Sequence, residues 1–254
     1  DIVLGEVDRR RNALELVAAV CSDPSEVDHP LAGGDHRKVS KELVLVVSSD
    51  RGLCGAYNGH ILRISKKLIL ERRAAGVDMH VETSGRKAPA FFKFEQIPVD
   101  EKHNIGDKPM YETVSAIADR FMDDFIAGEY DAIYVAYMKF ISPARQEPEI
   151  IQLLPLQPPS SDEATDSTNE SYEFTPDEEA LLNDLLPRSV RTTLFQAFND
   201  SAVSEQIMRM IAMKSATDNA GSLKRTLKRD FNRARQAKIT TELTEIVSGA
   251  AALE

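Results

Sequence analysis

The chain has 254 residues, of which 42% are hydrophobic and 28% charged, a composition that predicts a soluble protein with a buried core. Its formal net charge of -10 argues against nucleic-acid binding by the surface as a whole. Two distant cysteines, five scattered histidines and the absence of an apolar run of roughly 18 residues predict no disulfide framework, no metal site and no direct membrane span.

The first predicted element is a helix over residues 1–22, where Val3, Val7, Leu14 and Val17 are spaced as one helical face requires. Pro24 lies just beyond this segment and favours a stop. Residues 23–40 contain Pro and Gly and are predicted to form a loop.

Residues 41–155 are predicted to form an α/β domain. Apolar or alternating runs indicate strands at 43–48, 77–82, 132–138 and 150–154, and helical patterns indicate helices that begin near Asn58, at 88–94 and at 111–127. Asn58 is predicted to cap its helix. Strands that alternate with helices predict a Rossmann-like, mainly parallel sheet covered by helices.

The loop at 50–55 follows the first strand, at a position where phosphate-binding loops occur. It has neither the full G-x-G-x-x-G pattern nor the Lys and hydroxyl of a P-loop. We favour a structural turn that uses the backbone freedom of Gly52 and Gly55. Cys54 has no histidine in an obvious base relation to it, so a buried thiol is favoured over a nucleophile.

A linker and a helical region complete the chain. Residues 156–175 are rich in Pro, Ser, Thr, Asp and Glu and are predicted to be a surface linker. Residues 176–254 are predicted to be helical, with a break at Pro187. From 188 to 248 there is no proline, and an unbroken helix of this size is roughly 90 Å long. Its narrow apolar stripe predicts a coiled coil that needs a second strand.

A basic stretch at 224–238 interrupts the acidic character of the chain. Its seven basic residues are Lys224, Arg225, Lys228, Arg229, Arg233, Arg235 and Lys238, opposed only by Asp230. A solvated helix face is the ordinary interpretation of such a run, but within an acidic protein it favours an acidic protein partner. Nucleic acid ranks below a protein because the chain lacks overall basic charge and aromatic interleaving. No paired carboxylates, metal cluster or catalytic triad stands out, so spacing alone predicts no enzyme.

Four segments resemble the gamma subunit of F-type ATP synthases. Residues 239–252 (ITTELTEIVSGAAA) resemble the C-terminal signature of that family, and residues 209–223 (RMIAMKSATDNAGSL) resemble the run that precedes it. Residues 49–55 (SDRGLCG) and 152–156 (QLLPL) are similar to two shorter family motifs. No segment matches the Lys-rich, Ala/Met-rich helix with which family members begin.

The resemblance implies a rotor subunit without a catalytic site, cofactor or metal of its own. The C-terminal helix would pair antiparallel with an N-terminal helix and stand inside a catalytic ring of alpha and beta subunits, in which rotation is coupled to ATP synthesis or hydrolysis. The α/β domain would meet the epsilon subunit and the membrane c-ring. The complex would lie at the cytoplasmic face of a bacterial inner membrane, with this chain peripheral to it.

The resemblance also implies particular contacts. Arg235 and Gln236 match residues that contact a beta-subunit loop, Thr240 and Glu242 lie in the same region, and Arg209 matches a coupling position lower on the shaft. The basic stretch would face an acidic beta-subunit loop, and the alanine-rich tail would sit in an apolar bearing. Two other classes stay open from the residues alone: a small-molecule-binding α/β enzyme that uses the 50–55 loop, and a coiled-coil adaptor or nucleic-acid binder that uses the basic helix.

Overall fold

The structure, a computed structural model, describes Leu31 and residues 40–156 and 178–251. The elements, in chain order, are β1 (Lys41–Val47), α2 (Tyr57–Ala74), β2 (Asp78–Ser84), α3 (Lys87–Phe94), β3 (Glu101–His103), α4 (Tyr111–Ile126), β4 (Ala132–Ser142), β5 (Arg145–Leu154) and α5 (Glu178–Ala251). The predicted helix at 1–22 lies outside the described residues, as does the predicted linker except for Leu156.

Five strands form a single sheet in the order β3-β2-β1-β4-β5. The first four strands are parallel, and β5 returns antiparallel beside β4. β1 lies in the middle, and its residues from Glu42 to Val47 are buried, as a continuous Val and Leu run predicts for a strand covered on both faces. The predicted α/β class and mainly parallel sheet are therefore confirmed.

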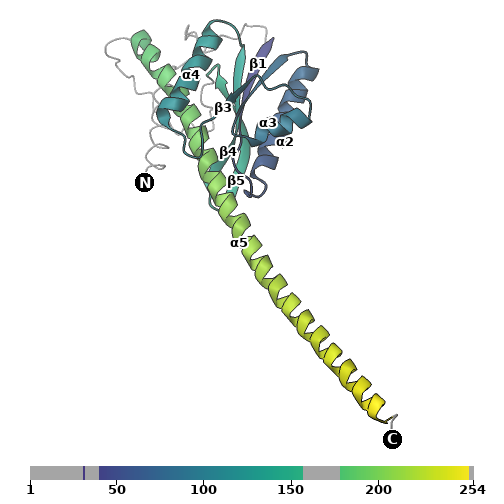
Figure 1. Cartoon of the computed structure of the whole chain (residues 1–254). Helices are drawn as coiled ribbons and strands as arrows, with labels where there is room; N and C mark the ends of the chain where they lie inside the picture. The colour runs from purple at the N-terminus through teal and green to yellow at the C-terminus, as the bar shows by residue number, and fades with distance from the viewer. Residues whose placement is uncertain (1–30, 32–39, 157–177, 252–254) are drawn as a thin grey trace. The chain divides into compact units, whose positions relative to one another are not determined.

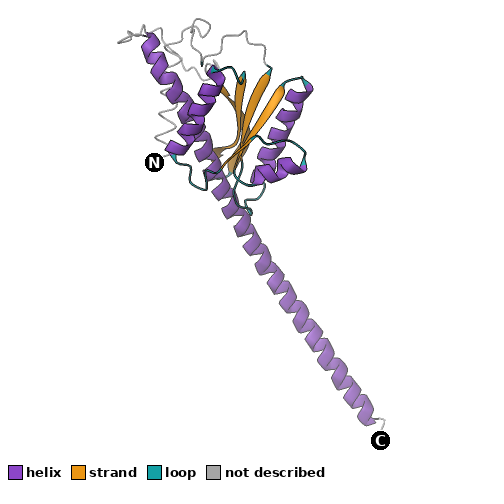
Figure 2. Ribbon diagram, turned by 45° about the horizontal axis from the view of Figure 1, so that its top comes forward, coloured by secondary structure: helices purple, strands orange, loops and turns teal. Residues whose placement is uncertain are grey.

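Helices cover both faces of this sheet (Figures 1 and 2). On one face Leu43, Leu45 and Val47 pack with α4 and with the first part of α5. On the other face Val44 and Val46 pack with α2 and α3. The period of two along β1 thus divides its side chains between two separate cores, and each core buries one apolar face of the flanking helices.

The carboxyl ends of β1 and β2 approach each other closely. The Ser48 hydroxyl donates to the Ser84 carbonyl at 2.8 Å and accepts the Ala88 N–H at 3.0 Å. Gly85 follows with a φ of +83°, and a Cβ added there would lie 2.1 Å from the Ser48 carbonyl oxygen. Only glycine fits this position, because any side chain would clash with backbone and also strain the left-handed conformation.

The predicted helix break at Pro187 is wrong. Helix α5 runs from Glu178 to Ala251 with Pro187 inside it. Proline in a helix interior costs about 3 kcal/mol, because its missing N–H removes a hydrogen bond and its ring meets the preceding turn. Leu186 and Val190 are buried on either side of it, and burying each contributes about 1.5–3 kcal/mol. Core packing therefore offsets the local penalty.

Three smaller expectations also differ from the structure. The N-cap of α2 is Ala56 and not Asn58, whose amide instead accepts the Ser49 N–H and donates to the Ser49 hydroxyl. The three-residue strand β3 has no counterpart among the predicted elements. β4 and β5 extend toward each other to form a hairpin, so β5 begins at Arg145 and not near residue 150.

The chain divides into two units, Asp1–Met208 and Arg209–Glu254, and α5 contributes to both. The first unit holds the sheet, its helices and the first part of α5. The second consists of the remainder of α5, where nearly all described side chains are exposed. The predicted boundary at residue 176 and the pairing with an N-terminal helix stay predictions.

Candidate functional site

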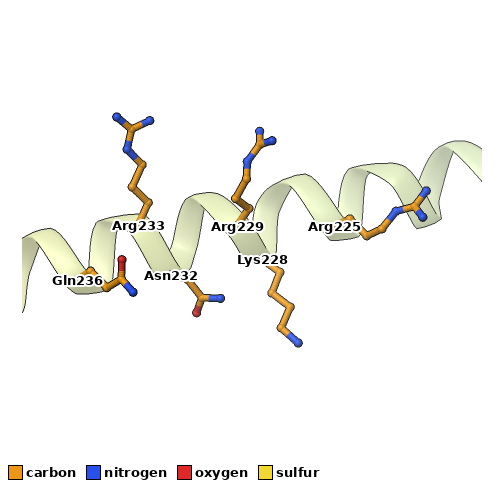
Figure 3. Close-up of a pocket in the computed structure, with 6 residues that line it drawn as sticks. All are labelled: Arg225, Lys228, Arg229, Asn232, Arg233 and Gln236. Carbon is orange, nitrogen blue, oxygen red and sulfur yellow. The ribbon is translucent and has the colours of Figure 1, made fainter.

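The basic stretch lies wholly on α5, in the second unit. Arg225, Arg229 and Arg233 follow one another at intervals of four residues and so form a row along one side of the helix. Lys228, Asn232 and Gln236 form a second row beside it. Figure 3 shows these six side chains fanning out from the ribbon, with Arg229 and Arg233 directed away from Lys228 and Asn232. They line an open surface of a single helix.

Little negative charge compensates this surface. Arg229 Nε lies 3.6 Å from Asp230 Oδ1, and Lys238 Nζ lies 3.8 Å from Glu242 Oε1. Both pairs are long and exposed, and such pairs contribute at most about 1 kcal/mol. The Arg225 guanidinium donates to the neutral Ser222 hydroxyl at 3.2 Å. The positive potential of the stretch is therefore available to an acidic surface.

An apolar row accompanies the arginine row. Leu223, Leu227 and Phe231 are 59%, 59% and 67% exposed. Each stands two positions before an arginine of the row, which at 3.6 residues per turn is a rotation of roughly 200°. The apolar and arginine rows thus occupy opposite sides of α5. One face can pack on an apolar helix while the other meets a charged partner.

The structure places the predicted contact residues as follows. Arg235, Gln236, Thr240 and Glu242 are exposed on α5, within and just beyond the basic stretch, whereas Arg209 is half-buried at the start of the second unit. The Thr240 hydroxyl donates to the Gln236 carbonyl at 3.0 Å, a bond internal to the helix. Four of the five residues therefore lie within about two helical turns of one another.

The loop after β1 has the geometry of a tied structural turn. Leu53 and Gly55 have φ values of 63° and 58°, so two residues are left-handed within three positions. Cys54 is 2% exposed, and the Asn58 amide donates to its sulfur at 3.2 Å. The Ser49 hydroxyl donates to the Arg51 carbonyl at 2.7 Å. These bonds tie the loop to Ser49 and Asn58, as the structural-turn interpretation predicts, although the buried Asp50 Oδ1 has no hydrogen-bond partner among the described residues.

A crevice of about 690 Å³ lies beyond the carboxyl ends of β2 and β3. Ligands of open α/β sheets bind at this end of the strands, so the crevice bears on the enzyme alternative. Its lining includes Arg86, Lys93, Lys102 and His103 but no Ser, Thr or Cys. A hydroxyl or thiol nucleophile beside a base is thus absent from its walls.

Sequence reasoning missed a charged cluster between β2, β3 and α4. Glu82 Oε2 lies 2.7 Å from His103 Nε2, and the Arg120 guanidinium bonds both Glu82 at 2.5 Å and Glu101 at 2.8 Å. Ligand atoms of Glu82, Glu101 and His103 are close enough to hold a cation. Arg120 already supplies that positive charge, so the arrangement is a satisfied ion-pair network.

The chain thus combines an α/β domain with a long helix whose C-terminal part is charged and exposed. The family model described as ATP synthase matches residues 8–253. Among relatives named ATP synthase gamma chain, that of Rhodopirellula baltica is 39% identical over 94% of this chain and 83% of its own length. The relative from Chloroflexus aurantiacus is 43% identical over 85% of this chain and 73% of its own length. The chain belongs to the ATP synthase gamma-chain family.

Solved structures support the same fold. A chain in the cryo-EM structure of the Euglena gracilis mitochondrial ATP synthase has a TM-score of 0.60 and 18% identity, with 99% of this chain and 92% of that chain covered. A chain in the central stalk/c-ring structure from Tetrahymena thermophila has a TM-score of 0.56 and 19% identity, with 85% and 94% covered. Neither the enzyme nor the adaptor alternative is favoured by these matches. Among the described helices, none combines the length and the apolar content needed to cross a bilayer.

Proposed function

We propose that this chain is the central-stalk rotor of an ATP synthase catalytic head and couples proton-driven rotation to ATP synthesis or hydrolysis in the beta subunits. The chain itself would carry no catalytic site, cofactor or metal. The family membership supports this role, and the observation that carries it is the exposed basic stretch on α5 of an otherwise acidic protein. An exposed cationic helix fits an acidic partner surface better than it fits catalysis.

The contact assignment is a proposal for five residues. Arg235 and Gln236 would bind a beta-subunit loop, Thr240 and Glu242 would contact the same region, and Arg209 would couple lower on the shaft. Gln236 lies in the second row, and Arg235 follows Phe231 at the four-residue spacing of the apolar row. Both side chains are exposed, so a partner loop can reach them without rearrangement of α5.

The proposed mechanism is mechanical. Charged and apolar rows on opposite sides make α5 asymmetric about its axis, so each beta subunit would meet a different surface at each angle. A partner state is favoured only through differential contact energy, and such differences would bias rotation. Alpha subunits would complete the ring, and the epsilon subunit and c-ring would bind the α/β domain. The complex would be peripheral to the cytoplasmic face of a bacterial inner membrane, and no nucleic acid is involved.

Reconstitution tests this proposal. The chain is mixed with an alpha–beta ring from a related bacterium, the complex is isolated by size, and ATP hydrolysis is assayed. We expect co-elution and a rise in ATPase activity. Arg235→Ala and Gln236→Ala should lower complex formation and ATPase activity, while each isolated variant stays folded. The control is Lys214→Ala, at an exposed basic residue outside the basic stretch. This control should leave complex formation and ATPase activity unchanged. Unchanged activity in both contact variants would refute the contact assignment, and failure of the wild-type chain to bind would refute the rotor role.

A further inference from the structure

We infer that Ser201 and Ser204 are positioning residues that hold α5 in a fixed rotational position on the sheet. This inference rests on the proposed rotor function, since a rotor must pass turning force between its α/β domain and its helix. Both serines, and the strand that they bond, belong to the first unit. They therefore lie on the part of α5 that packs against the sheet, close to where the helix leaves the domain core.

Met138 of β4 lies where the sheet narrows to the β4–β5 hairpin. Pairing between β1 and β4 stops at Ala136, two residues earlier. The Met138 N–H and carbonyl point away from Pro148, the residue opposite it on β5, so β5 does not supply their partners. Met138 thus lies just beyond the β1–β4 ladder and needs partners other than a strand.

Helix α5 supplies these partners. The Met138 N–H donates to the Ser201 hydroxyl at 3.2 Å, and the Ser204 hydroxyl donates to the Met138 carbonyl at 3.5 Å. Ser201 is 2% exposed, Ser204 is 0% exposed, and Met138 is fully buried. The shorter bond makes Ser201 the principal partner, and the longer one makes Ser204 a weaker one.

The serines continue a stripe of α5 that is apolar before them. Val190, Leu194 and Phe198 are buried in the core that α5 shares with α4. Met208, farther along the helix, packs against the opposite core, shared with α2 and α3. Between these two contacts α5 passes the end of the β1–β4 ladder. The serine hydroxyls satisfy the strand backbone there.

The serine hydrogen bonds differ from the apolar contacts of α5 because their strength depends on direction. Hydrophobic burial is non-directional, so the apolar contacts resist rotation of the helix only through the close packing of their side chains. A hydrogen bond weakens steeply once its geometry departs from linearity, so twisting α5 about its axis must break the Ser201 bond. Arg191 Nε also reaches Asp119 Oδ1 of α4 at 2.6 Å, but this pair is partly exposed and screened by solvent. The buried serine bonds are therefore a directional restraint that solvent does not screen.

Two measurements test this role with one set of variants: Ser201→Ala, Ser204→Ala, the conservative Ser201→Thr, and Ser222→Ala as a control at an exposed serine of the same helix. The first measurement is hydrogen exchange at the Met138 amide in the isolated full chain. Loss of one buried hydrogen bond should speed exchange about fivefold in Ser201→Ala. The effect should be smaller in Ser204→Ala, and exchange should stay near wild-type in Ser201→Thr and Ser222→Ala.

The second measurement uses the complete ATP synthase in lipid vesicles and compares protons pumped per ATP hydrolysed. If α5 is held less firmly on the sheet in Ser201→Ala, this variant should pump fewer protons per ATP hydrolysed, while ATP hydrolysis itself continues. Ser201→Thr should have the wild-type ratio. Faster exchange with an unchanged ratio would overturn the positioning role and leave only a structural bond. Exchange equal to that of Ser222→Ala would overturn the bond itself. If the wild-type chain failed to join the complex, the rotor function would fail, whereas the exchange result would still decide the bond.

Discussion

Glu82 and Glu42 are two buried carboxylates whose surroundings act in opposite directions. Burial alone would raise the pKa of Glu82, but hydrogen bonds from His103 and Arg120 outweigh it and hold this pKa below the ordinary value. For Glu42, burial outweighs the nearby Arg72 guanidinium and raises the pKa. Glu82 thus favours folding when ionised, and its contribution is lost as the pH falls through its folded-state pKa. Glu42 has the opposite effect: the free energy of unfolding falls as the pH rises, because burial disfavours the ionised carboxylate in the folded chain.

The substitution Glu82→Gln tests the first of these statements. At pH 7 the variant should have a free energy of unfolding about 1–3 kcal/mol lower than wild-type, because Arg120 and His103 lose a charged partner. This difference should shrink as the pH falls through the folded-state pKa of Glu82, which lies below the ordinary value. Urea unfolding between pH 3.5 and 7 measures both effects.

Glu101→Gln is the matched control, because Glu101 also bonds Arg120 but is about half exposed. Its effect should stay below about 1 kcal/mol. A Glu82→Gln difference that is the same at pH 3.5 and pH 7 would contradict the assigned ionisation.

This cluster could not have been found from the sequence. Glu82 is 21 positions from His103 and 38 from Arg120. The three meet only because the short strand β3 pairs with β2 and because α4 covers that edge. A strand of three residues is too short to show a period, and ion pairs distant in sequence leave no local signal. The basic stretch, in contrast, lies within four turns of one helix and was predicted from spacing alone.

Among the elements, β1 and α5 differ in how well local rules describe them. The Val and Leu run at the start of the domain predicted a doubly buried strand, and β1 is one, since burial on both faces leaves a pattern in the sequence itself. The prediction at Pro187 failed, because the proline rule is local whereas the core contacts of Leu186 and Val190 are tertiary. The resemblance to the family lies in specific motifs, which composition and periodicity do not predict.

Pro187→Ala should therefore stabilise the first unit. The substitution restores a backbone N–H and removes the ring from the preceding turn, so we expect the free energy of unfolding to rise by up to about 3 kcal/mol. Chemical denaturation of the isolated chain is the measurement. Arg188→Ala, at the exposed neighbouring position, should change stability by no more than about 0.5 kcal/mol. A loss of stability in Pro187→Ala would mean that packing of the ring outweighs the backbone bond.

At the scale of the whole molecule, the basic stretch should make assembly sensitive to salt. Reversing the arginine row with Arg225→Glu, Arg229→Glu and Arg233→Glu together should weaken binding to the alpha–beta ring at least about tenfold at low ionic strength. Wild-type binding should weaken as salt rises, whereas the triple variant should lose most of this dependence, because screening acts on exposed charges.

Lys214→Glu provides the control, because it reverses one exposed charge on the same helix outside the basic stretch. Dissociation constants measured at two salt concentrations compare the variants. Equal salt dependence in wild-type and the triple variant would exclude the arginine row from the interface.

The Met138–Pro148 pairing has a consequence for the chain before it finds any partner. Among the described strands β5 is the last on its side of the sheet, and unpaired strand edges are templates for aggregation. The first half of β5 carries Pro148 between Glu147 and Glu149, so a stray strand would meet a missing donor and two carboxylates. Pro148 thus shields a newly made subunit from edge-to-edge association with its own copies before assembly.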